Sequence, residues 1–188
     1  MKKNEIAKII NPLPGRKAGA SGAGSVRGVG SADPLFSTEH SKKVGCSARP
    51  SVSETVKELL KSIGEDIHRE GLRQTPQRVA ESFSKLFEGY GQDPQKLITV
   101  FKNEGYKELI IAREIDFYSI CEHHLLPFYG KATVGYIPNK KIIGLSKLPR
   151  LVELYSRRLQ NQERLTKQIA DTLEKMIAPK GIGVLIEA

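Results

Sequence analysis

The stretch LIIAREIDFYSICEHHLLPFYGKATVGYI, residues 109–137, contains two runs that are rich in β-branched and aromatic residues. Such runs favour strands, and we expect one at about residues 109–120 and a second at 131–137. Pro127 and Gly130 lie between the runs, where they indicate a change of direction. The core of the fold should therefore include this pair of strands.

Helical patterns lie on both sides of the strands. Ser51-Val52-Ser53-Glu54 has the pattern of a capping box, and Thr75-Pro76 places a capping residue before a proline at the first helical position. Ser146 can cap a third helix, whose apolar face would extend to Leu159. A fourth helix is expected at about 162–177. The pattern predicts an α+β fold.

A last apolar strand is expected at 183–188, with Val184, Leu185 and Ile186 at its centre. Such a strand needs partners on its hydrogen-bonding edges. No return strand follows in the given sequence, so we expect another chain to complete the sheet or the sequence to be cut short.

Residues 1–50 differ in composition from the rest. They hold seven of the 17 glycines and show no sustained apolar period. They also carry nine Lys and Arg against three Asp and Glu, which is +6 of the net charge of +9. We expect a disordered basic leader, or alternatively a transit peptide, followed by one domain over 51–188.

Composition restricts the class of protein. The positive charge belongs mainly to the leader, which lacks interleaved aromatic residues, so nucleic-acid binding is not expected. The longest apolar runs are too short to span a membrane. Two cysteines, Cys46 and Cys121, cannot form a disulfide framework, and we expect a reducing, cytoplasmic location.

Cys121-Glu122-His123-His124 is the most informative motif. Cys121 and His124 have a C-x-x-H spacing, and thiolate and imidazole are ligands that zinc favours. His123 would remain free to transfer protons, since histidine titrates near neutral pH. Glu122 could orient an imidazole. The alternative is a polar strand end beside a buried cysteine.

Two further groups of residues could bind a nucleotide. Lys147 and Arg150 are three residues apart at the start of a helix, where free backbone N–H groups also favour phosphate. Gln162 and Glu163 could bind the edge of a base, since a carboxylate accepts from neighbouring N–H groups. Taken alone, Lys147 and Arg150 are more often a solvated charged face. Gln162 and Glu163 could equally be an exposed helix start, and Arg78 would more often be a surface residue.

Together these motifs resemble the GTP cyclohydrolase I family. The resemblance covers about 51–188 and rests on four segments in order: HREGLRQTPQRVA, SICEHHLLPFYGKATVGYIPN, IGLSKLPRLVELYSRRLQNQERLTKQIA and GVLIEA. It implies a T-fold (tunnelling fold) over 105–188, with N-terminal helices over 51–90, an antiparallel sheet and two long helices. It further implies a homo-oligomer, a decamer in the family, with active sites at subunit interfaces.

The resemblance also implies an activity. The family opens the imidazole ring of GTP hydrolytically, releases formate and forms 7,8-dihydroneopterin triphosphate, the first step towards folate and tetrahydrobiopterin. It assigns Cys121 and His124 as zinc ligands, and His123 and Ser146 as catalytic residues. The expected substrate-binding residues are Glu122, Lys147, Arg150, Gln162, Glu163 and Arg78.

The given sequence departs from the family pattern after Ala188, where the third zinc ligand, a cysteine, is expected. We therefore expect the last strand of the T-fold to be missing, and a chain limited to these residues to bind zinc weakly and turn over little GTP. An alternative is a truncated or degenerate T-fold that forms oligomers or binds a nucleotide or pterin without turnover.

Overall fold

The computed structural model describes residues 6–12 and 50–188. Within these residues the chain forms two compact units: a sheet unit of 6–12 and 88–188, and a helical unit of 50–87. The expected division at residue 50 into a leader and one domain stays a prediction.

The sheet unit is built on a five-stranded sheet with the strand order β1-β7-β4-β3-β6. Neighbouring strands are antiparallel, except that the short β6 is parallel to β3. The strands are β1 (Ile6–Pro12), β3 (Ile110–Cys121), β4 (Pro127–Ile137), β6 (Leu159–Gln160) and β7 (Gly181–Glu187). A second sheet pairs β2 (Val100–Lys102) with β5 (Lys141–Ile143). The expected α+β class with an antiparallel sheet is confirmed.

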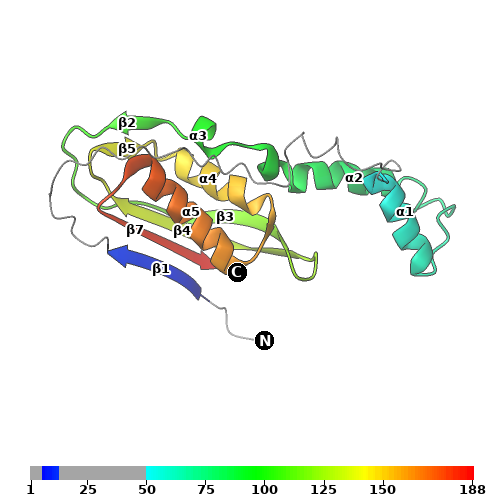
Figure 1. Ribbon diagram of the computed structural model, residues 1–188. Helices are drawn as coiled ribbons and strands as arrows, with labels where there is room; N and C mark the ends of the chain where they lie inside the picture. The colour runs from blue at the N-terminus through cyan, green and yellow to red at the C-terminus, as the bar shows by residue number, and fades with distance from the viewer. Residues whose placement is uncertain (1–5, 13–49) are drawn as a thin grey trace, which may run out of the picture. The chain divides into compact units, whose positions relative to one another are not determined.

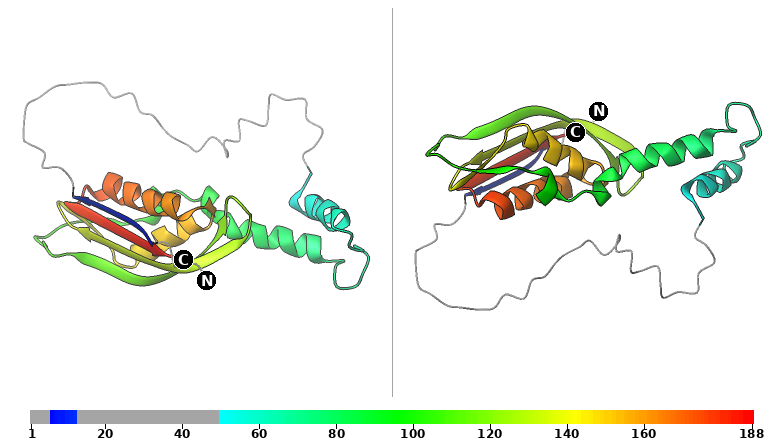
Figure 2. Two further views of the ribbon diagram at one scale, coloured as in Figure 1. Left: turned by 90° about the horizontal axis from the view of Figure 1, so that it is seen from below. Right: turned by 90° about the horizontal axis from the view of Figure 1, so that it is seen from above.

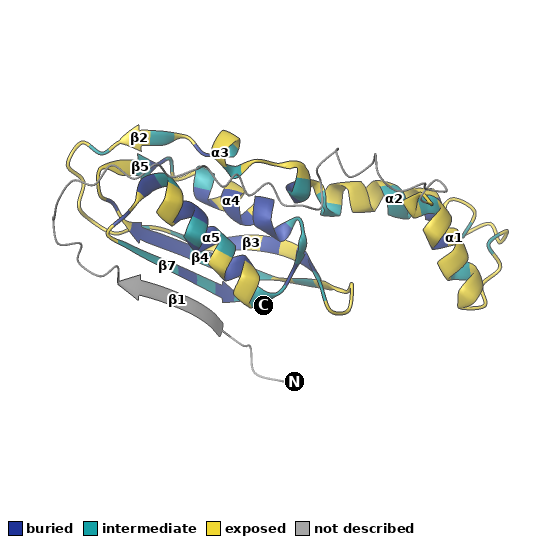
Figure 3. Ribbon diagram, viewed as in Figure 1, coloured by how far each residue is buried: buried dark blue, intermediate teal, exposed yellow. Residues whose placement is uncertain are grey.

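Two helices, α4 (Lys147–Ser156) and α5 (Gln162–Ile177), lie on one face of the sheet (Figures 1 and 2). Their inner sides are buried and their outer sides exposed (Figure 3). On α5 the fully buried apolar residues recur at helical spacing, and on β4 and β7 they alternate. The main members of this core are Phe117, Val134, Tyr136, Leu148, Leu151, Leu165, Ile169, Leu173, Val184 and Ile186. Shorter elements, η2 (Glu88–Gly91) and α3 (Pro94–Leu97), precede β2.

The strands β3 and β4 form the predicted pair, but β4 begins four residues earlier than expected. Pro127 is the first residue of β4, and Gly130 lies within it rather than in a turn. The glycine is required by packing, because a Cβ there would lie 1.9 Å from the Glu187 oxygen of β7. Glu114, with a positive φ of 57°, lies at a bulge in β3 where the register shifts.

The last strand is paired on both edges within the structure. β7 pairs with β4 on one side and with β1 on the other, in a continuous register from Ile6 opposite Glu187 to Pro12 opposite Gly181. The expectation that residues 1–50 form no element was therefore wrong for residues 6–12. The other leader residues, 1–5 and 13–49, lie outside the described residues, as does Cys46.

The helical unit contains α1 (Val52–Ser62) and α2 (Thr75–Leu86). The capping box is confirmed: Ser51 accepts from the Glu54 backbone, and Glu54 accepts from the Ser51 N–H at 2.6 Å, a bond that lowers the pKa of Glu54. The predicted cap at Thr75 was wrong. Gln74 holds the N-cap position, and Thr75 is already helical.

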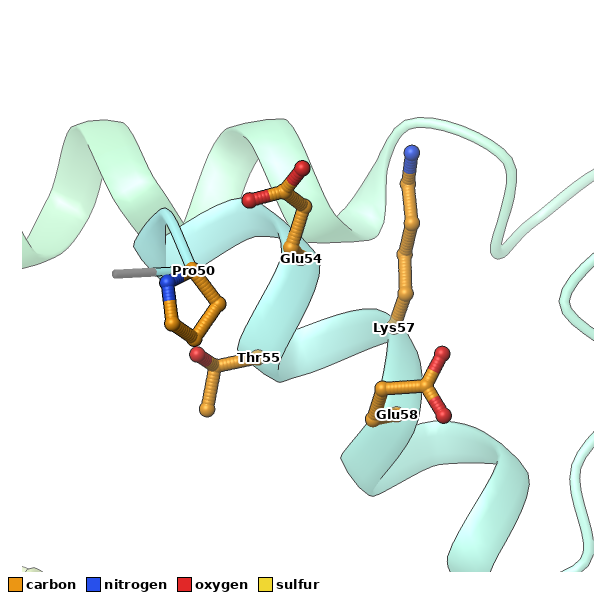
Figure 4. A pocket seen from close by; sticks show the side chains of 5 residues that line it. All are labelled: Pro50, Glu54, Thr55, Lys57 and Glu58. Atoms are coloured by element: carbon orange, nitrogen blue, oxygen red, sulfur yellow. The ribbon is translucent and has the colours of Figure 1, made fainter. Parts of the chain in front are cut away.

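A surface hollow lies beside α1 (Figure 4). Its lining consists of five exposed residues, Pro50, Glu54, Thr55, Lys57 and Glu58. No side chain in this lining is buried, so the hollow is not a built binding site.

The helix α4 differs from expectation both at its N-cap and in where it ends. Ser146 holds the N-cap position, but its side chain makes no capping hydrogen bond. Leu159 lies in β6 rather than in the helix, because the chain leaves α4 after Ser156 to pair with β3. The fourth helix is confirmed at 162–177. In the described part of the chain no helix has the length and apolarity needed to cross a membrane.

Tyr136 links the two sheets and gives a test of the fold. Its fully buried hydroxyl accepts from the Ile143 N–H at 2.9 Å and donates to the Ile143 oxygen at 3.3 Å. Tyr136→Phe should lower the free energy of unfolding by about 1–3 kcal/mol at neutral pH, because the Ile143 N–H loses its acceptor. Tyr129→Phe, an exposed position on the same strand, should change it by less than about 0.5 kcal/mol in urea titrations.

The Tyr136→Phe substitution should also change how the free energy of unfolding depends on pH. Burial raises the pKa of Tyr136, and the hydrogen bond with Ile143 only partly opposes this. A raised pKa means that the folded state holds the proton more tightly, so this stability is complete below the ordinary tyrosine value of about 10 and is lost as pH rises through the folded-state pKa. Alkaline unfolding measurements should show this loss in the wild type and a smaller loss in Tyr136→Phe. An identical loss in both would contradict the assignment.

Candidate zinc and nucleotide site

The CEHH motif forms the turn between β3 and β4. Cys121 is the last residue of β3, and its N–H donates to the Leu126 oxygen at 2.8 Å. The Leu125 N–H donates back to the Cys121 oxygen at 2.9 Å, and Leu125 takes a left-handed φ of 56° to close the turn. These bonds fix a tight turn from which the motif's side chains project.

The two expected metal ligands lie side by side. Cys121 Sγ and His124 Nδ1 are 3.7 Å apart. A tetrahedral zinc ion with sulfur at about 2.3 Å and nitrogen at about 2.0 Å holds these two atoms roughly 3.5 Å apart. The residues therefore fit zinc without rearrangement. No group of three His, Cys, Asp or Glu residues suited to a metal occurs in the residues that the structure describes.

His123 lies beside the ligand pair and is open to solvent. Its side chain is 65% exposed, and its Nε2 is 3.7 Å from Glu122 Oε1. Its ring meets the His124 ring edge to face, with centroids 6.2 Å apart. A histidine so placed can exchange protons with a bound molecule and with water.

The N-terminus of α5 adjoins the turn. Glu122 accepts from Asn161 Nδ2 at 2.6 Å and forms an ion pair with Arg164. Gln162 and Glu163 are the first two residues of α5 and lie between these partners in sequence. Gln162 Oε1 is buried without a hydrogen-bond partner within the described structure. The structure therefore brings the expected base-binding residues to the expected zinc ligands.

The expected phosphate-binding residues lie elsewhere in the sheet unit. The start of α4 follows β5 and carries Ser146, Lys147 and Arg150. The Ile143 N–H of β5 donates to the Tyr136 hydroxyl near the end of β4. The far end of α4 leads to β6, beside Cys121. A ten-residue helix is about 15 Å long, so these residues and the CEHH turn lie at opposite ends of α4 (Figure 1).

Arg78 belongs to the helical unit. It is exposed on α2, where its guanidinium donates to Gln74 Oε1 at 2.9 Å. Its expected contact with phosphate stays a prediction.

Sequence reasoning overlooked Asn161 and Arg164. Both are close in sequence to Gln162 and Glu163, but their partner Glu122 is 39 and 42 residues away. Asn161 carried a signal that could have been used, since asparagine favours the N-cap position that it holds here.

The fold is a mixed α+β fold with an antiparallel sheet, and comparison with known proteins identifies its family. The GTP cyclohydrolase I family model matches residues 52–188. The chain therefore belongs to the GTP cyclohydrolase I family, whose T-fold is consistent with the mixed sheet and helices seen here.

Several curated relatives share the name GTP cyclohydrolase 1. The protein from Wolinella succinogenes is 51% identical over 138 residues, 73% of this chain and 74% of that protein. The protein from Chlorobium phaeovibrioides is 55% identical over 140 residues, 73% of this chain and 62% of that protein. The protein from Deinococcus radiodurans is 56% identical over 133 residues, 70% of this chain and 61% of that protein. The chain thus spans less than two thirds of the latter two relatives.

Proposed function

We propose that this chain is a zinc-dependent GTP cyclohydrolase, which opens the imidazole ring of GTP, releases formate and yields 7,8-dihydroneopterin triphosphate. The observation that carries the proposal is the 3.7 Å separation of Cys121 Sγ and His124 Nδ1, which suits one zinc ion. Membership of the GTP cyclohydrolase I family supports GTP as the substrate and hydrolytic ring opening as the reaction. Formation of a dihydropterin triphosphate places the reaction in folate and pterin biosynthesis, and a cytoplasmic location is expected with it.

Cys121 and His124 would hold the metal, and its remaining ligands would come from outside the described residues or from another chain. Zinc, when bound, supplies the Lewis acid that activates water for attack on C8 of the purine. His123, exposed beside the ligand pair, would carry protons to and from the opening ring.

The nucleotide would be held by residues at the two ends of α4. Glu163 is exposed at the start of α5 and would accept from the guanine N–H groups, with Gln162 beside it. Lys147 and Arg150 would hold the triphosphate, and Ser146 would contact the ribose. Because these two groups lie at opposite ends of α4, a complete site is best supplied by two copies of the chain, as the family's interface sites imply.

The free face of the sheet supports this assembly. Opposite the helices, Tyr118 and Tyr129 are 62% and 72% exposed, with ring centroids 6.2 Å apart. Lys131 bonds Asp116 at 2.8 Å on the same face. A homo-oligomer, a decamer as in the family, would cover this face.

The product formed from GTP tests this proposal. The protein as its gene encodes it, loaded with zinc, should convert GTP to a product that retains three phosphates and has the absorbance of a dihydropterin, as seen by anion-exchange chromatography. Tight binding of GTP that is recovered unchanged would instead support the alternative, a T-fold that binds nucleotide or pterin without turnover.

A further inference from the structure

Protein groups engage both carboxylate oxygens of Glu122. Oε1 accepts from Asn161 Nδ2 at 2.6 Å, and Oε2 pairs with Arg164 Nη1. The Glu122 side chain is only 18% exposed. A carboxylate with this burial and two donors is held in one orientation.

Asn161 acts on two elements at once. Its Oδ1 accepts from the Arg164 N–H at 2.7 Å and so caps α5, while its Nδ2 donates to Glu122 in the CEHH turn. One amide group therefore sets the distance between the helix start and the turn.

The backbone adds a third connection in the same place. The Glu122 N–H donates to the Gln160 oxygen at 3.0 Å, and Cys121 pairs with Gln160 in the β3–β6 ladder. Arg164 is half exposed, so its ion pair alone would contribute little. The turn is fixed by three contacts together: the backbone pairing with Gln160, the Asn161 amide and the Arg164 guanidinium.

We propose that Asn161 and Arg164 are positioning residues: they clamp Glu122 to the start of α5, so that the zinc ligands Cys121 and His124 and the guanine-binding residues of α5 keep one fixed geometry. This inference rests on the proposed function for the roles of those ligands and residues. The clamp itself rests only on the contacts above.

The clamp can be broken without removing the helix cap. In Asn161→Asp, the second carboxylate oxygen replaces Nδ2 and faces Glu122, while the first still caps α5. The reversed pair, Asn161→Asp with Glu122→Gln, restores a donor and an acceptor across the same contact. A double-substitution cycle of this kind isolates the interaction from the effect of each change alone.

The first readout uses no metal and no nucleotide. Amide hydrogen exchange at Glu122 and Leu125, measured by NMR, should accelerate roughly tenfold in Asn161→Asp, because a charge-assisted bond is lost from the turn. The reversed pair should restore slow exchange. Unchanged exchange in Asn161→Asp, or no recovery in the reversed pair, would overturn the clamp.

The second readout reports on the metal ligands. Cobalt(II) should bind the wild type with the near-ultraviolet absorption of a thiolate–cobalt bond. Asn161→Asp should weaken its affinity by about 10–100-fold, the usual effect of losing a group that orients a ligand, and the reversed pair should recover it. Faster exchange with unchanged cobalt affinity would overturn the claim that the clamp positions the ligands.

A matched control tests Arg164. Arg164→Gln should accelerate exchange in the turn, whereas Lys167→Gln should not, although Lys167 also forms an ion pair on α5, with Asp171 at 3.1 Å. Equal effects would show a general loss of helix stability and overturn the role of Arg164. If the clamp holds in all these measurements but GTP is not converted, the proposed function fails and the clamp stands.

Discussion

In the protein as its gene encodes it, Cys121→Ala should reduce the zinc content from near stoichiometric to background and abolish GTP turnover with it. Cys121 is one of the two expected zinc ligands, and its Sγ lies 3.7 Å from His124 Nδ1. Structural zinc ions bind zinc-finger peptides with about 10–16 kcal/mol, so the loss of one thiolate ligand should remove most of the affinity. Metal content after gel filtration, measured by mass spectrometry, gives the result directly.

The chain offers a matched control for this substitution. Cys46→Ser removes the other cysteine, which lies outside the described residues, and should leave zinc content and turnover unchanged. Equal zinc loss in both variants, or full zinc retention in Cys121→Ala, would contradict the assignment of Cys121.

His123→Ala should lower kcat by about 10²–10⁴-fold while zinc content stays at the wild-type level. The imidazole is exposed beside the ligand pair and lies 3.7 Å from Glu122 Oε1, so it can move protons without holding the metal. Formate release under saturating GTP separates this effect from weaker binding. His68→Ala, an exposed histidine of the helical unit, should behave as wild type.

Substitutions of the two histidines of the motif should therefore differ in their effect on zinc content. His124→Ala should lose both zinc and turnover, and His123→Ala only turnover. Zinc loss in His123→Ala with retention in His124→Ala would reverse the two roles and contradict the geometry of the turn.

Features that depend on local sequence were predictable. The capping box at Ser51 and the helix at 162–177 follow from residues within one or two turns of each other, and the structure has both. The β3 strand follows from a continuous apolar and aromatic run. In these segments local preference and tertiary packing favour the same structure.

Features that depend on residues far apart in the sequence were not predictable. The β1–β7 pairing joins residues about 175 positions apart, and no local pattern in Ile6–Pro12 specifies it. The early start of β4 depends on its pairing with the end of β3, from Pro127 opposite Ile120 to Gly130 opposite Phe117. For the site, the CEHH motif and the start of α5 were predicted separately, but their connection through Glu122 was not, because it depends on how β6 pairs with β3.

The central claim is that Cys121 and His124 hold a zinc ion that serves hydrolysis of the purine ring of GTP. The most direct measurement is the amount of formate released per GTP consumed, in protein as isolated, after chelation and after zinc is restored. We predict one formate per GTP, loss of the activity on chelation and its return with zinc. Zinc-replete protein that leaves GTP intact, or formate release that is indifferent to the metal, would contradict the claim.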